Sequence, residues 1–234
     1  MDDLLIINCY FGNNIENIHK APSKKNCYFF TNNSKFKDKI EEKHWTYYFI
    51  NFPIKELDTS SIQSKYIKFL IFLRDFPEFK KYKHIFYFDH KSDIPERCLP
   101  IIYNLIKENL DKSIVIRNHE QNRNTIQTEI DVASRWQSRY RIPMPQTQEY
   151  VNELIEKKEI DNNVLLCNTG LIMYVNYNNV TEMLDNIYNK IIEHKQPECQ
   201  IYWGIFSQKY KSYIKEINWY DFNKLVNYEM RWPH

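Results

Sequence analysis

Glycine is scarce in this sequence, with 3 residues among 234, whereas aromatic residues make up 16%. Rings rather than small side chains must therefore fill the core and line any cleft. Tyrosine, with 18 copies, combines a flat apolar face with a polar edge, and such rings can stack on sugars and nucleobases. Any single ring is still more often a core residue than a binding residue.

A surplus of one charge is also lacking. The sequence has 32 basic and 30 acidic residues, a formal net charge of +2, and the two signs are interleaved along the chain. Nucleic-acid-binding proteins concentrate basic residues in a patch or stripe. We therefore expect no nucleic-acid partner.

The sequence has neither closely paired cysteines nor a long apolar run. Its five cysteines are odd in number, far apart and without a Cys-x-x-Cys pair, which indicates reduced, mostly buried thiols in an intracellular protein. They are Cys9, Cys27, Cys98, Cys167 and Cys199. The apolar run at 4–9 follows two acidic residues and is too short for a signal peptide or a membrane span. We expect a cytoplasmic protein with no membrane span, whose first strand is this run.

The remaining composition is that of a globular protein, with 43% hydrophobic and 26% charged residues. A chain of this length can bury one substantial core. We predict one domain over residues 1–218, with an aromatic-rich tail at 219–234 that packs back on it.

Short apolar runs between polar turn residues predict strands at 4–9, 27–30, 47–50, 85–88, 114–116 and 171–175. Helical spacing predicts a helix capped by Ser60 or Ser61 that ends near Asp75, before Pro77. Further helices are expected at 101–110, 125–138, 148–157, 180–194 and 199–209, and 141–147, with two prolines, is expected to be a loop. The alternation favours an α/β fold with a mostly parallel central sheet and helices on both faces.

Asp89 is the most informative polar residue, because it directly follows the apolar run at 85–88. In open α/β sheets, ligands bind beyond the carboxyl ends of the strands. An aspartate there can hold a divalent cation against a diphosphate, or accept a hydrogen bond from ribose or sugar hydroxyls. The alternative is an aspartate that caps a helix or stabilises a turn.

Several segments follow the order of motifs in one enzyme family. They are Cys27-Tyr28-Phe29-Phe30-Thr31-Asn32, Lys65-Tyr66-Ile67-Lys68, Phe76-Pro77-Glu78-Phe79 leading to Tyr87-Phe88-Asp89, His119-Glu120 with Arg123 and Glu129, Asn168-Thr169-Gly170-Leu171-Ile172, and Glu198-Cys199-Gln200 with Lys209. Over about residues 5–210 this order resembles the GT-A nucleotide-diphospho-sugar glycosyltransferases. It is most similar to a poorly characterised branch formerly catalogued as a domain of unknown function.

The resemblance implies a single GT-A (Rossmann-like) domain that transfers a sugar from a UDP- or GDP-sugar to a glycan or glycoprotein acceptor. It implies that Asp89 and Glu129 are catalytic, with Glu129 deprotonating the acceptor hydroxyl or steadying the oxocarbenium charge. The implied donor-binding residues are Tyr10, Phe11, Thr31, Asn32, Lys65, Lys68, Asp89 and His90. The implied acceptor- or sugar-binding residues are His119, Arg123, Asn168, Thr169, Gly170 and Gln200.

Several of these roles have a structural alternative. The rings of Tyr10 and Phe11 can equally be core residues. The lysines at 65 and 68 can lie on a solvated helix face, and Glu129 can be a buried salt-bridge partner of Arg123.

The metal site departs from the family pattern. Metal-dependent members of the wider superfamily carry Asp-x-Asp, whereas this chain has Asp89-His90-Lys91, with Asp93 two residues further on. The resemblance implies a divalent cation, manganese, on Asp89, with His90 as a candidate second ligand. Lys91 instead suits a metal-independent site in which basic side chains offset the diphosphate charge.

Cys199 stands where the branch usually has Asp, which leaves the next residue, Gln200, as the sugar contact.

Two other functions remain open from the sequence. A catalytically silent carbohydrate- or nucleotide-binding module would keep the fold without Asp-x-Asp. A nucleotidyltransferase would require a carboxylate cluster around Asp89, for which Asp93 is the only partner close in sequence.

Overall fold

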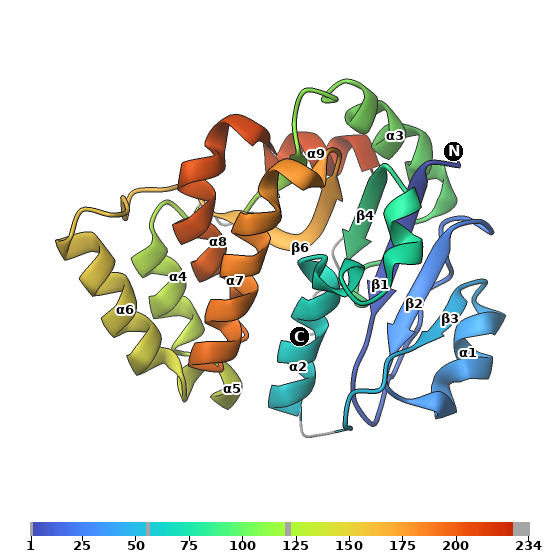
Figure 1. The fold of residues 1–234 in the computed structure, drawn as a ribbon, viewed down its shortest axis with the longest axis horizontal. Coiled ribbons are helices and arrows are strands. Elements are labelled where there is room, and N and C mark those ends of the chain that lie inside the picture. Colours follow the sequence, from blue (N-terminus) through green and yellow to red (C-terminus); the bar gives the residue numbers. More distant parts are fainter. Residues whose placement is uncertain (1, 55–56, 120–122, 227–234) are drawn as a thin grey trace.

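The computed structural model describes residues 2–54, 57–119 and 123–226, and in these residues the strands form one seven-stranded sheet (Figure 1). The strands are β1 Leu4–Cys9, β2 Cys27–Thr31, β3 Thr46–Phe49, β4 His84–Phe88, β5 Ile114–Asn118, β6 Cys167–Tyr174 and β7 Ile214–Ile217. Their order is β3-β2-β1-β4-β6-β5-β7, and only β6 runs against its neighbours. The prediction of an α/β fold with a mostly parallel sheet is confirmed.

The reversed strand β6 determines what meets at one edge of the sheet. Phe88, the last residue of β4, pairs with Leu171, and Asn118, the last residue of β5, pairs with Cys167. The start of β6 therefore lies beside the carboxyl ends of β4 and β5. We call this side of the sheet, where β1, β2, β4 and β5 end and β6 begins, the strand-exit edge.

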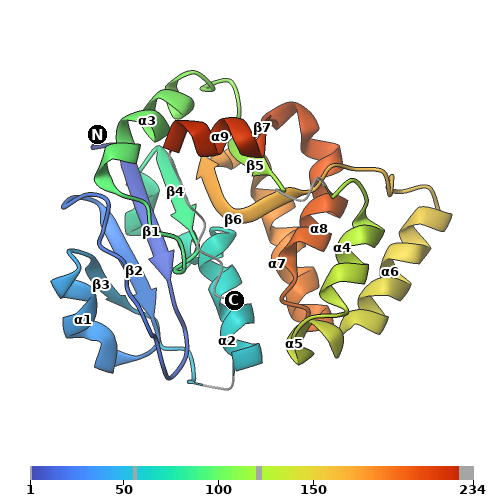
Figure 2. The same cartoon turned by 180° about the vertical axis from the view of Figure 1, so that it is seen from behind.

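Helices cover both faces of the sheet, as the alternation predicts (Figures 1 and 2). Their bounds are α1 Lys37–Glu42, α2 Leu57–Lys68, α3 Leu99–Lys107, α4 Ile126–Ala133, α5 Ser138–Arg141, α6 Met144–Glu156, α7 Thr181–His194, α8 Cys199–Phe206 and α9 Trp219–Val226. Residues of α2, α7 and α8 share a core with one face of β1 and β4, and residues of α1, α3 and α9 share a core with the other. All six residues of β1 are buried, as expected of a strand covered on both sides.

The predicted helix at 60–75 is wrong at both ends. Helix α2 already begins at Leu57, before the serines predicted to cap it, and ends at Lys68. Leu70 takes a left-handed conformation with φ 60° and starts a short 3-10 turn at Ile71–Leu73. The apolar spacing continues beyond the helix because this turn is itself buried against the core.

The predicted loop at 141–147 is also wrong. Helix α5 ends at Arg141, and α6 begins at Met144 with proline in its first turn. Proline is tolerated there because the first N–H groups of a helix have no partner within it. The helix predicted at 125–138 is shorter than expected, since α4 ends at Ala133.

The strand β7 and helix α9 come after the elements that the sequence predicts. In α9, Trp219 and Phe222 are buried, and their rings lie 4.1 Å and 5.6 Å from the guanidinium of Arg117. Their apolar surface covers the end of β5. The part of the tail at 227–234 lies outside the described residues.

Across the described part of the chain, no helix is both long and apolar enough to span a lipid bilayer.

Candidate functional site

Asp89 is the first residue after β4 and lies on the strand-exit edge. Its backbone N–H donates to the carbonyl of Gly170 at 2.9 Å, and its carbonyl accepts from the N–H of Ser92 at 2.8 Å. Tyr87, two residues earlier, donates its hydroxyl to Oδ1 of Asp89 at 2.6 Å, because side chains two apart on a strand lie on the same face. The carboxylate is thus fixed by its own strand.

Lys68, the last residue of α2, forms an ion pair with this carboxylate: Nζ lies 3.0 Å from Oδ1 of Asp89. The Lys68 side chain is 3% exposed and that of Asp89 43%, so the pair has the lysine inside and the carboxylate at the surface. Burial opposes ionisation of Asp89, but the charges of Lys68 and Lys65 and the Tyr87 hydrogen bond outweigh it and lower its pKa. Burial also opposes the charge on Lys68, and Asp89 outweighs it, so the pKa of Lys68 is raised.

Asn168 and Gly170 lie in the first part of β6, which passes close to Asp89. A Cβ added to Gly170 would lie 2.9 Å from Oδ1 of Asn168 and 3.2 Å from Oδ2 of Asp89. Oδ1 of Asn168 also accepts from the N–H of Gly170 at 2.9 Å. Glycine therefore allows both side-chain oxygens to lie close to the backbone of β6, and a larger residue would displace them.

A second polar cluster contains two carboxylates. Glu129 on α4 is ion-paired with Arg123, and their side chains are only 2% and 7% exposed. Gln200 donates from Nε2 to Oε1 of Glu129 at 3.0 Å and from its backbone N–H to Oε1 of Glu198 at 3.3 Å. Burial and then the charge of Glu129 raise the pKa of Glu198 to about 7. Gln200 thus bridges the carboxylate of Glu129, which is ion-paired, and that of Glu198, whose pKa is raised.

Cys199, the first residue of α8, connects the two clusters. Its sulfur lies 3.2 Å from Oγ1 of Thr169 and 4.0 Å from Nζ of Lys68. Its chain neighbour Glu198 caps the same helix. A continuous series of contacts therefore leads from Asp89 to the carboxylate cluster, and we call the whole arrangement the edge site.

The ring of Tyr10 borders the edge site on the β1 side. It meets the ring of His90 edge-on at 4.9 Å. Burial lowers the pKa of His90 to about 4, although the charge of Asp89 works in the opposite direction. His90 is therefore neutral at neutral pH.

Arg139 lies on α5 beside Tyr140, whose backbone carbonyl accepts from Nε2 of Gln196 at 2.9 Å. Oε1 of Gln196 accepts in turn from the N–H of Glu198 at 3.0 Å. The guanidinium of Arg139 contacts the Tyr140 ring 4.8 Å from the ring centre and donates from Nη2 to the Tyr140 hydroxyl at 2.9 Å. Its Nε is buried and has no hydrogen-bond partner within the described ranges. Arg139 thus adds a guanidinium to the border of the site.

Three residues expected to bind the donor are packed into the protein. The ring of Phe11 is 1% exposed and lies 5.5 Å from that of Phe52. Thr31 is fully buried, and Asn32 is 3% exposed. Oδ1 of Asn32 accepts from the N–H of Gly12 at 3.1 Å, so it joins the chain segments that follow β1 and β2. A direct donor contact by these three side chains stays a prediction.

His119 follows β5 and is 4% exposed. Its backbone N–H donates to the carbonyl of Leu166 at 2.8 Å, and the N–H of Leu166 donates to the carbonyl of Arg123. These bonds hold the two ends of the segment after β5 against the residues that lead into β6. The residues between them, at 120–122, lie outside the described part.

Sequence reasoning missed Tyr87, Arg139 and Glu198. The two-residue spacing of Tyr87 from Asp89 was a usable signal, because alternate strand residues share a face. Glu198 was quoted only as a neighbour of Cys199, and its position at the start of a helix was a signal that it caps that helix. Arg139 gave no signal, because its segment was expected to end one helix and begin a loop.

The donor set does not fit a manganese ion held by the protein. Oδ1 of Asp89 already accepts from Tyr87 and Lys68, and Asp93 lies instead 3.9 Å from His19. No group of three or more His, Cys, Asp or Glu residues that could hold a metal ion occurs within the described ranges. Divalent cations in proteins prefer several oxygen ligands, and here one carboxylate is already paired with an ammonium.

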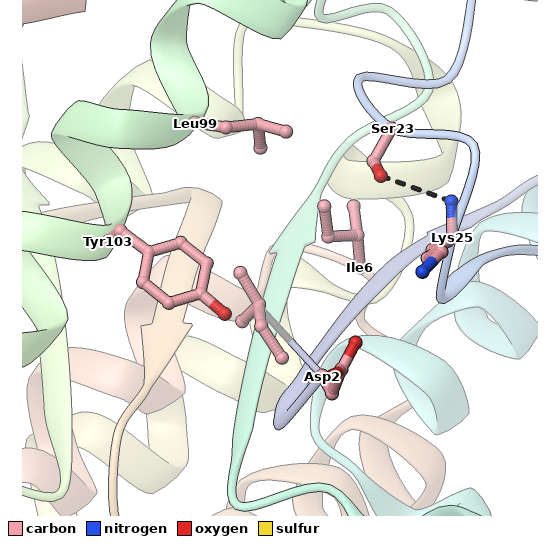
Figure 3. Close-up of a pocket in the computed structure, with 7 residues that line it drawn as sticks. Asp2, Ile6, Ser23, Lys25, Leu99 and Tyr103 are labelled. Atoms are coloured by element: carbon pink, nitrogen blue, oxygen red, sulfur yellow. Dashed lines mark hydrogen bonds between the residues drawn. The ribbon is translucent and has the colours of Figure 1, made fainter.

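Two cavities of the molecule lie away from the edge site. The one in Figure 3 is lined by the start of β1 and by Leu99 and Tyr103 of α3, with the N–H of Lys25 donating to Oγ of Ser23 at 3.1 Å. The other adjoins His84, the first residue of β4. Both are at the amino ends of parallel strands, opposite the edge where ligands of α/β sheets bind.

The carboxylate of Glu198 leads to a prediction about the pH dependence of stability. Its folded pKa is raised, so protonation favours the folded state, and stability falls as pH rises from about 4.5 to above 7. Glu198→Gln, which keeps an oxygen for the Gln200 N–H, should therefore raise the free energy of unfolding by about 1–2 kcal/mol at pH 8 and change it little at pH 5. Urea titrations at the two pH values measure this difference.

The control is Glu149→Gln, which removes an exposed carboxylate on α6. It should change stability equally little at both pH values. A Glu198→Gln variant that gains nothing at pH 8 would contradict the assignment of a half-buried carboxylate with a raised pKa.

Comparisons with known proteins give only distant likenesses in fold. No family model and no curated protein matches the sequence. Among solved structures, mouse xyloside xylosyltransferase 1 has a TM-score of 0.46 at 9% identity, covering 92% of this chain and 85% of that chain. A glycosyltransferase involved in glycosylation of the major capsid of PBCV-1 has a TM-score of 0.41 at 8% identity, covering 92% and 81%. A CMP:2-keto-3-deoxy-manno-octonic acid synthetase complexed with CTP has a TM-score of 0.40 at 7% identity, covering 92% of this chain and 89% of that chain. The functions of these proteins do not transfer to this chain at such values.

Proposed function

We propose that this chain is a glycosyltransferase that moves a sugar from a nucleotide-diphosphate donor to a hydroxyl of a glycan or glycoprotein acceptor. The observation that supports this most directly is the edge site itself. Asp89, fixed by Lys68 and Tyr87, lies on the strand-exit edge, and contacts through Cys199 connect it to a pair of carboxylates. The motif order of the sequence, which resembles nucleotide-sugar transferases, agrees with this chemistry.

In the proposed reaction, the bond between the sugar C1 and the donor phosphate breaks, and a bond between C1 and the acceptor oxygen forms. The nucleoside diphosphate leaves, and the acceptor hydroxyl loses its proton. Asp89 binds the donor: Tyr87 and Lys68 both contact Oδ1, which leaves Oδ2 beside Gly170 to accept from a sugar or ribose hydroxyl.

The acceptor proton is taken up by the carboxylate pair of Glu129 and Glu198. A group that accepts a proton works best with a pKa near the working pH, and the pKa of Glu198 is raised to about 7. Glu129, ion-paired with Arg123, holds the side chain of Gln200. The role proposed for Gln200 is to bind the transferred sugar.

The test uses the full chain and a set of UDP- and GDP-sugars. We expect at least one donor to raise the melting temperature, because a ligand that binds only the folded state stabilises it. The same donor should be hydrolysed slowly without acceptor, measured as release of UDP or GDP. Binding without any release would instead identify a silent binding module, and neither binding nor release with any donor would contradict the proposal.

A further inference from the structure

Resting on the proposed function, we propose that the edge site holds the donor diphosphate without a divalent cation, using Lys65 and Arg139 as its positive groups. A cation bridge is needed where a protein carboxylate faces a phosphate, since both are negative. The contacts of Asp89 remove that need.

The negative charge of Asp89 is already balanced inside the protein. The ammonium of Lys68 lies 3.0 Å from Oδ1 of Asp89, and the Lys68 side chain is only 3% exposed. A dication placed on the same carboxylate would face this ammonium at short range, which is unfavourable. At Oδ1, the buried lysine therefore supplies the counter-charge that a metal ion would otherwise supply to Asp89.

Two further cations remain to face the diphosphate. Lys65 lies one turn before Lys68 on α2, so the two lysines are neighbours on the helix surface. Against burial, its positive charge acts to lower the pKa of both Asp89 and Glu198. Arg139 lies on α5 beside Tyr140, which the side chain of Gln196 connects to Glu198. Guanidinium groups bind phosphate oxygens through paired N–H donors.

The described contacts of Arg139 leave its charge unbalanced by a carboxylate. They are to Tyr140, a neutral side chain, through Nη2 and ring stacking. A guanidinium of this kind suits a phosphate group, whose oxygens its N–H donors can bind in pairs.

The experiment measures binding of UDP, GDP, UMP and GMP to the full chain by calorimetry, with EDTA, with Mn²⁺ and with Mg²⁺. We expect a diphosphate to bind with the same affinity in EDTA and in either metal, within about twofold, because the chain itself neutralises the phosphates. Lys65→Gln and Arg139→Gln should each weaken binding of the diphosphate by about tenfold in all three conditions. Both substitutions should weaken binding of the monophosphates by less.

Arg141→Gln is the matched control, because it removes an exposed arginine two positions along α5, which does not face the same side as Arg139. It should leave diphosphate affinity unchanged. Melting temperatures near wild type show that each variant is folded.

The outcomes separate this inference from the proposed function. Binding and donor hydrolysis that require Mn²⁺ would overturn the metal-free site while leaving the transferase proposal intact. Metal-free binding that survives both Lys65→Gln and Arg139→Gln would overturn the assignment of these two cations. Absence of nucleotide binding and of hydrolysis in every condition would contradict both proposals.

Discussion

Asp89→Ala is expected to abolish donor hydrolysis and to lower the free energy of unfolding by about 3–5 kcal/mol. The loss of stability follows because the ammonium of Lys68, whose side chain is 3% exposed, would be left without its counter-charge. The loss of activity follows because Oδ2 of Asp89 is the proposed acceptor of a donor hydroxyl. Urea unfolding and release of nucleoside diphosphate measure the two effects separately.

A double variant separates the two roles of Asp89. Lys68→Met combined with Asp89→Ala removes both charges, and replacement of a buried ion pair by apolar groups is often neutral for stability. We expect the double variant to regain most of the stability and to remain inactive. Recovery of activity together with stability would show that Asp89 has only a structural role.

Asp93→Ala is the matched control for this series. Asp93 follows Asp89 by four residues, its side chain is 64% exposed, and its contact is with His19 at 3.9 Å. We expect stability and hydrolysis close to wild type. A large loss of activity would favour the carboxylate cluster that a nucleotidyltransferase requires.

Strands β1 to β6 were predictable as short apolar runs, which are typical of strands in a covered sheet, whereas β7 was not predicted. Asp89 could be singled out for the same reason, since it is the first polar residue after such a run. The direction of β6 could not be predicted, because periodicity carries no information on strand direction. The approach of Gly170 to Asp89 depends on that direction.

The pairing of the charged residues could be predicted only in part. Lysine is almost never fully buried unless it is paired. A solvated helix face was therefore the alternative for Lys68, and the structure instead buries this lysine beside Asp89. The ion pair of Arg123 with Glu129 was one of two stated alternatives, and the structure contains it. The carboxylate partner Glu198 was missed, because α8 brings it near Glu129 only in the folded chain.

The buried pair of Arg123 and Glu129 should give the second large effect. Glu129→Leu removes the carboxylate that is ion-paired with the buried guanidinium of Arg123, so we expect a loss of about 3–5 kcal/mol in the free energy of unfolding. Glu129→Gln can still accept from Nε2 of Gln200, and it should be more stable than Glu129→Leu. It should nevertheless transfer sugar about 10²–10⁴-fold more slowly, because the proposed acid/base pair loses one carboxylate.

The controls for this series use one buried and one exposed ion pair. Arg123→Met combined with Glu129→Leu should restore stability towards wild type without restoring transfer, because both buried charges are gone. Glu153→Ala breaks the pair with Lys157 on α6, whose side chains are 56% and 55% exposed, and should leave the melting temperature and the transfer rate unchanged. If Glu129→Gln keeps the wild-type transfer rate, the carboxylate of Glu129 serves only to hold Arg123, and proton transfer must be assigned to Glu198 alone.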